Sequence, residues 1–102
     1  MAKAIKTGAD NLLANVPEEY VFRCCDGGIY RNAQELANAL TTMAEETYAY
    51  HASKERNDFS NWVRDIMKDD KLARDLTKAQ NKMQARKAIL ERIAYLQRQS
   101  SK

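Results

Sequence analysis

A helical stripe of apolar side chains occupies the middle of the chain. Large apolar residues recur there at the spacing i, i+3, i+4, i+7 and i+8: Phe59, Trp62, Val63, Ile66 and Met67. This spacing places side chains on one face of a helix. Full burial of each contributes about 1.5–3 kcal/mol, whereas an N-cap contributes about 1 kcal/mol. We therefore expect burial to drive formation of this helix, and a cap at Asn57 or Asp58 to set where it begins.

A longer helix is expected before the stripe, over residues 33–51. Asn32 followed three residues later by Glu35 has the spacing of a capping box, which marks a helix start. The side expected to be buried carries Leu36, Leu40, Met43, Thr47 and Tyr50. A polar connection, residues 52–56, then separates the two helices.

Residues 20–31 differ from the rest, because their aromatic and β-branched side chains favour strands. Asp26 and the two glycines after it supply a turn that tolerates positive φ. We expect a short hairpin with strands at about 20–24 and 29–31. Since a two-stranded hairpin is marginally stable alone, it must pack on the helices or pair with strands of another chain.

Two further helices are predicted after the stripe. A break at the two aspartates after Lys68 precedes a short helix over residues 71–76. Thr77, with a glutamine three residues on, resembles a second capping box ahead of a last helix over residues 78–98. Without a break at Thr77, residues 71–98 would form one long helix, and no glycine or proline decides between the two.

A length of 102 residues is typical of one domain. We expect a mainly α fold, a compact helical domain of three to four helices with a short N-terminal β-hairpin. Residues 1–19 are predicted to form a flexible N-terminal arm, because Pro17 forces the residue before it out of helical geometry and terminal segments are mobile unless docked. Residues 20–99 would form the helical domain and residues 100–102 a tail.

Hydropathy and cysteine usage suggest a compartment. No run approaches the roughly 18 apolar residues of a membrane span, and the first residues lack the apolar core of a secretory signal. A cytoplasmic protein without membrane contact is therefore expected. The adjacent Cys24 and Cys25 would stay reduced there, since neighbouring cysteines rarely bridge each other.

Few side chains could carry catalysis or hold a metal. The available ligands are Cys24, Cys25, His51 and Asp58, but none of the spacings typical of zinc sites links them. A cysteine with His51 would be the candidate nucleophile and base. A hydrogen-bonded, structural His51 at a helix end is the simpler interpretation. We expect no catalytic residue, no metal and no cofactor.

Charge is distributed unevenly along the chain. Residues 9–70 carry six basic and twelve acidic side chains, a net charge of −6, whereas residues 71–102 carry nine basic and two acidic side chains, a net charge of +7. Five cations at helical spacing are candidate nucleic-acid contacts: Lys71, Arg74, Lys78, Lys82 and Arg86. On one continuous helix they would form a stripe able to follow phosphates. The alternative is a solvated face that pairs with acidic residues of the same domain.

The last helix also suggests a second copy as a partner. Its C-terminal half presents a wide apolar surface made by Ile89, Leu90, Ile93 and Leu96. Most such surfaces belong to the chain's own core. A helix this long can also extend past its domain, so a homodimer is an alternative.

Four short motifs stand out along the chain: F-R-C-x-D-G at 22–27, L-A-x-x-L at 36–40, H-x5-N-D-F-S-N-W-V-R-D at 51–65 and L-A-x-x-L at 72–76. Together they resemble a family of small archaeal and bacterial domains without an established activity. The resemblance covers residues 20–78 and implies these signature positions: His51, Asn57, Asp58, Phe59, Trp62 and Asp65. They can form a binding site or a structural latch of helix end, cap and core aromatics.

These observations favour a small non-enzymatic binding or adaptor module with a protein partner. The alternative is a nucleic-acid-associated protein that uses residues 71–98. No arrangement in the sequence meets the geometric roles that an enzyme site requires. The single tryptophan is expected inside, clamped by the segment that ends at the histidine.

Overall fold

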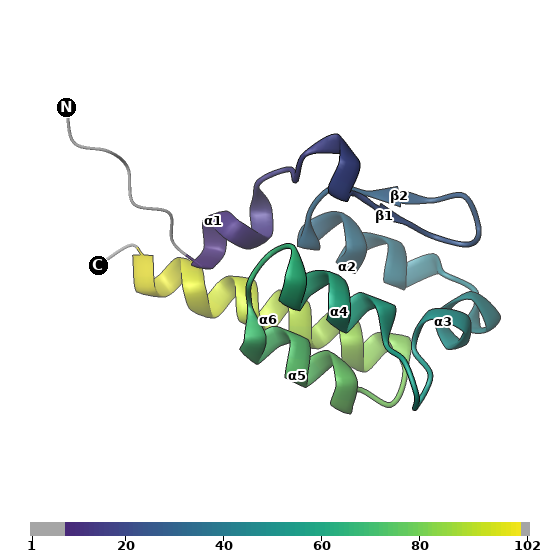
Figure 1. Ribbon diagram of the computed structural model, residues 1–102. Coiled ribbons are helices and arrows are strands. Elements are labelled where there is room, and N and C mark those ends of the chain that lie inside the picture. The colour runs from purple at the N-terminus through teal and green to yellow at the C-terminus, as the bar shows by residue number, and fades with distance from the viewer. Residues whose placement is uncertain (1–7, 101–102) are drawn as a thin grey trace.

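In the computed structural model, which describes residues 8–100, the longest helix packs against three others (Figure 1). This helix is α6 (Lys82–Ser100), and it contacts α1 (Gly8–Leu13), α2 (Ala33–Thr42) and α5 (Asp70–Lys78). Helix α4 (Asp58–Asp65) packs against α5. The arrangement confirms the mainly α fold, although these residues form six α-helices where three to four were expected.

The hairpin is confirmed and is shorter than predicted. Its antiparallel strands are β1 (Phe22–Arg23) and β2 (Ile29–Tyr30), with Phe22 opposite Tyr30. In the turn, the Gly27 N–H donates to the Cys24 carbonyl at 2.9 Å. Gly27 has a φ of 96°, which a residue with a Cβ rarely adopts, so the glycine permits the turn.

The described part of the expected flexible arm lies against the domain. Helix α1 packs on α6, and Leu12 is fully buried between them and the rest of the core. A 3-10 helix, η1 (Glu18–Tyr20), follows, and the Val16 N–H donates to the Arg31 carbonyl at 2.9 Å. Residues 1–7 of the arm lie outside the described residues, as do residues 101–102 of the tail.

The prediction of a single helix over residues 33–51 is wrong. Helix α2 ends at Thr42, and a second helix, α3 (Glu45–His51), follows it. Met43 between them is extended, with a ψ of 137°, and its side chain is buried. Its carbonyl accepts a hydrogen bond from the Lys82 ammonium of α6. A tertiary contact therefore stabilises the break. The break also changes the buried face, so that Tyr48 and His51 point inward while Tyr50 is exposed.

Helices α4 and α5 both begin at a residue whose side chain caps the helix. The Asn57 side-chain oxygen accepts from the Ser60 N–H at 2.9 Å, so Asn57, rather than Asp58, is the cap of α4. The Asp69 carboxylate likewise accepts from the Leu72 N–H at 2.9 Å at the start of α5. The burial of the stripe is confirmed, since four of its five side chains are buried and Ile66 is partly buried. The helix itself is shorter than predicted, because α4 ends at Asp65 and Ile66 and Met67 lie beyond it.

Helices α5 and α6 are separate, as predicted, but the cap between them is not Thr77. Helix α5 continues through Lys78, and the Thr77 hydroxyl donates to the Arg74 carbonyl within it. The α6 N-terminus is capped by Asn81, whose side-chain oxygen accepts from the Gln84 N–H at 2.8 Å. Among the described helices, none is long and apolar enough to cross a membrane.

Candidate functional site

His51, the last residue of α3, lies at the meeting point of the hairpin and the start of α4. Its side chain is buried, with 6% of the residue exposed. The imidazole centroid is 5.1 Å from that of Phe22 and 5.4 Å from that of Phe59. The exposed ring of Tyr50 covers it from outside, with a centroid distance of 4.9 Å. Aromatic rings therefore hold the imidazole in place on several sides.

Both nitrogens of His51 form hydrogen bonds. Nε2 lies 3.0 Å from the Cys25 backbone nitrogen, and since that group can only donate, Nε2 accepts. The proton of the neutral ring then resides on Nδ1, which donates to the Asp58 carboxylate at 2.9 Å. The other oxygen of Asp58 pairs with Arg56 Nε at 2.9 Å. The chain Arg56–Asp58–His51 aims Nε2 at the hairpin turn.

Trp62 is inside, as the sequence predicts, but His51 does not clamp it directly. Phe22 lies between them, with its centroid 5.5 Å from the indole. The indole N–H donates to the Tyr20 carbonyl at 2.7 Å, so the tryptophan also fastens the segment before the hairpin. The sequence indicated Phe22 only as one of several strand formers in residues 20–24 and as the first position of the F-R-C-x-D-G motif.

Of the remaining signature positions, Asn57 and Phe59 contribute to the packing of the fold, whereas Asp65 lies on the surface. The Asn57 amide reaches the Leu76 carbonyl at 3.2 Å, which ties the start of α4 to α5. Phe59 is buried in the core. Asp65 is exposed and pairs with its neighbour Arg64 at 3.0 Å, away from the His51 cluster.

The two cysteines lie beside the imidazole. Among the described residues, Cys24, Cys25 and His51 form one group whose sulfur and nitrogen atoms all lie within 4.8 Å of one another. Cys24 is buried and Cys25 is exposed, and both are free thiols. These residues were available ligands in the sequence, but their spacing could not show that the hairpin turn lies against the end of α3. These three residues are called the thiol–imidazole cluster below.

Burial and hydrogen bonding shift three pKa values around this cluster. Burial raises the pKa of the Cys24 thiol and of the Tyr30 hydroxyl behind it. The Gly28 backbone N–H, which donates to Asp26 at 2.9 Å, lowers the pKa of that carboxyl group.

The cluster does not have the arrangement of a nucleophile and its base. A base must direct a free lone pair at the thiol proton. The Nε2 lone pair of His51 instead accepts the backbone N–H of Cys25.

The five predicted nucleic-acid contacts do not form one stripe, because the chain breaks between α5 and α6. Lys71 pairs with Asp75, and Lys82 turns inward to the Met43 carbonyl and lies 3.8 Å from Glu45. Arg74 and Lys78 are exposed on α5, and Arg86 is half-buried on α6. The apolar surface proposed as a dimer seam is mostly core, since Ile89 and Ile93 are buried and Leu90 and Leu96 are partly buried.

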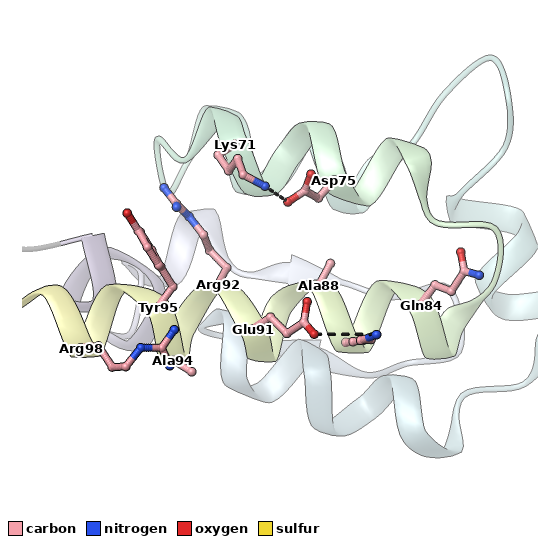
Figure 2. A pocket seen from close by; sticks show the side chains of 10 residues that line it. Lys71, Asp75, Gln84, Ala88, Glu91, Arg92, Ala94, Tyr95 and Arg98 are labelled. Atoms are coloured by element: carbon pink, nitrogen blue, oxygen red, sulfur yellow. Dashed lines mark hydrogen bonds and ion pairs between the residues drawn. The ribbon is translucent and has the colours of Figure 1, made fainter.

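A groove of about 920 Å³ runs between α5 and α6. Figure 2 shows Lys71 and Asp75 on the side of α5 that faces α6, with Ala88, Arg92 and Tyr95 pointing back from α6. Four cationic and two anionic side chains line it: Lys71, Lys87, Arg92, Arg98, Asp75 and Glu91. The groove therefore has an excess of positive charge, and sequence reasoning found only Lys71 among its residues.

Comparison of the chain with protein-family models, with curated proteins and with solved structures gave no match. The resemblance of the His51–Asp65 signature to a small domain family stays a prediction.

Proposed function

We propose that the protein is a small non-enzymatic binding module whose α5–α6 groove receives an amphipathic helix with an acidic polar face from a protein partner. The observation that carries this proposal is the groove itself, which is lined mainly by α6, with Lys71 and Asp75 of α5 along one side, and has more cationic than anionic side chains. Helix-in-groove recognition uses such surfaces, because the apolar face of the ligand packs between two helices.

The shape of the groove suits a helix. A volume of about 920 Å³ lies toward the upper end of the roughly 300–1,000 Å³ typical of ligand sites. Ala88 is small and lies on the α6 side of the groove, so a partner backbone can approach closely there (Figure 2). Tyr95, which is 46% exposed, offers an aromatic surface nearby.

The charges of the groove favour acidic ligands. Lys71 and Lys87 pair with acidic residues one turn along their own helices. Exposed pairs of this kind contribute only about 0–1 kcal/mol, so the two lysines lose little stability when they pair with a partner's carboxylates instead. Arg92 is held by Asp69 at 3.0 Å and lies 5.7 Å from the Tyr95 ring centre, which makes it a fixed part of the wall.

Charge reversal in the groove is expected to weaken helix binding. The probes are two synthetic amphipathic helices, identical except that glutamate or lysine fills the polar face. We expect the glutamate peptide to shift the amide resonances of residues 84–98 in NMR spectra, and Lys71→Glu with Lys87→Glu to weaken its affinity at least about tenfold, equal to about 1.4 kcal/mol. The control is Lys54→Glu in the exposed α3–α4 connection, which is compared with the single reversal Lys71→Glu because both lower the net charge by two.

Two results would contradict the groove proposal. If Lys54→Glu weakens binding as much as a groove reversal, net charge alone accounts for the affinity. If the glutamate peptide shifts no resonance on α5 or α6, the groove does not take an acidic helix. Light scattering on the same samples reports whether a second copy occupies the groove instead.

Nucleic-acid association through residues 71–98 remains the alternative. Arg74 and Lys78 are its best-placed contacts, because both are exposed on α5. If this is the function, Arg74→Glu with Lys78→Glu should weaken DNA binding and reduce the salt slope of log affinity by about 2, roughly one for each phosphate contact. Fluorescence anisotropy with duplex and single-stranded DNA measures this slope, and a slope that the double variant leaves unchanged removes the alternative.

A further inference from the structure

We propose that Cys24, Cys25 and His51 form a binding site for a thiolate-preferring divalent metal ion of the zinc class. The three donor atoms lie within 4.8 Å of one another. Two come from the hairpin turn and one from the end of α3, so the site needs only two segments of backbone to meet. The proposal is independent of the α5–α6 groove, which uses other residues.

The donor set is that of a zinc site, and the donor atoms lie close to the spacing that such a site requires. Two thiolates and one imidazole nitrogen are among the common ligands of Zn²⁺, at about 2.3 Å for sulfur and about 2.0–2.1 Å for nitrogen. Neighbouring ligands of a tetrahedral zinc then stand roughly 3.5–3.8 Å apart. The donor atoms of the cluster are at most 4.8 Å apart, so they must move closer by about 1 Å or less to bind one ion.

Asp58 supplies a second observation that points to a metal. Histidine ligands of metals usually donate their other ring N–H to a carboxylate, which fixes the tautomer and the ring orientation. His51 Nδ1 lies 2.9 Å from the Asp58 carboxylate, and Nε2 is thereby directed at the two cysteines. Arg56 in turn holds Asp58. The imidazole is thus oriented before any ion arrives.

Metal binding requires one local rearrangement. The Nε2 lone pair now accepts the Cys25 N–H, and the ion must take that lone pair. The N–H can turn aside because Cys25 lies at the exposed tip of the hairpin, where Gly27 already adopts a φ of 96°. On binding, both thiols release their protons to solvent and form metal–sulfur bonds. Three protein ligands leave the fourth position to water, as in zinc sites that are open to substrates.

The test uses Co²⁺ and Zn²⁺ on the full chain, freed of metal and kept reduced with a phosphine. We expect one Co²⁺ per chain, with the near-ultraviolet thiolate–cobalt absorption and the intense visible bands of tetrahedral cobalt. Zn²⁺ should displace the cobalt and raise the melting temperature. Absence of the thiolate–cobalt band in the unmodified protein would overturn the proposal.

Matched variants separate the site from incidental thiol binding. Asp58→Asn should weaken Co²⁺ affinity by about 10–100-fold, as the loss of a carboxylate behind a histidine ligand does. Asp65→Asn, an exposed aspartate on the same helix, should leave the affinity unchanged. Cys25→Ser should weaken affinity more than Asp58→Asn, and because Cys25 is exposed, circular dichroism should show an intact fold. Cobalt spectra and affinity that Cys25→Ser leaves unchanged would refute the proposed ligands.

Discussion

Phe59→Ala is expected to lower the free energy of unfolding by about 3–5 kcal/mol, the range for removing a buried phenylalanine ring. Phe59 is 1% exposed, and its ring centroid lies 5.1 Å from that of Phe22 and 5.7 Å from that of Tyr48. It also lies against His51. Since domains of this size are stable by about 5–15 kcal/mol, the variant should lose a large part of its stability. Denaturant unfolding followed by circular dichroism measures the change.

Two controls identify burial as the cause. Phe59→Leu retains most of the apolar volume, so it should lose clearly less stability than Phe59→Ala. Tyr50→Ala removes an aromatic ring that is 60% exposed, and it should change stability by about 0.5 kcal/mol or less. Equal losses for the alanine variants at positions 59 and 50 would show that the ring cluster does not stabilise the fold.

Asp69→Ala is expected to lower the free energy of unfolding by about 3 kcal/mol, because one side chain has two roles. One carboxylate oxygen caps α5 through the Leu72 N–H, and the other accepts from Arg92 Nε at 3.0 Å. The Asp69 side chain is 6% exposed and that of Arg92 is 22% exposed. The substitution therefore leaves a largely buried cation without its partner and a helix start without its cap. Thermal and denaturant unfolding both report the loss.

The neighbouring aspartate provides the comparison. Asp70 is exposed in the first turn of α5, where a negative charge contributes only about 0.3–1 kcal/mol through the helix dipole. Asp70→Ala should therefore be several times milder than Asp69→Ala. Asp69→Asn keeps an oxygen that can cap the helix and should fall between them. If the two alanine variants are equally stable, the link between Asp69 and Arg92 contributes nothing.

Patterns that repeat within one helix could be read from the sequence. The apolar stripe that begins at Phe59 is local, since its period alone places it on one face, and the cap at Asn57 lies directly before it. The hairpin could also be predicted, because its signal is local too: Asp26 and the glycines after it specify a turn between two strand-like runs.

Features that depend on distant contacts could not be predicted in this way. Nothing near Met43 signals a helix break, because the lysine that binds its carbonyl is 39 residues away. The sequence pattern favoured Thr77 as the cap of the last helix, but α5 continues through Lys78 and Asn81 is the cap instead. The thiol–imidazole cluster joins residues 26 positions apart, so no spacing rule contains it.

The hydrogen bond from the Trp62 indole to the Tyr20 carbonyl gives the molecule a built-in optical reporter. Because the chain has a single tryptophan, its emission comes from one known environment. Detachment of residues 18–20 would expose the indole N–H to solvent and shift the emission to longer wavelength while the helical dichroism stays constant. Fluorescence can thus distinguish release of this segment from global unfolding without any added label.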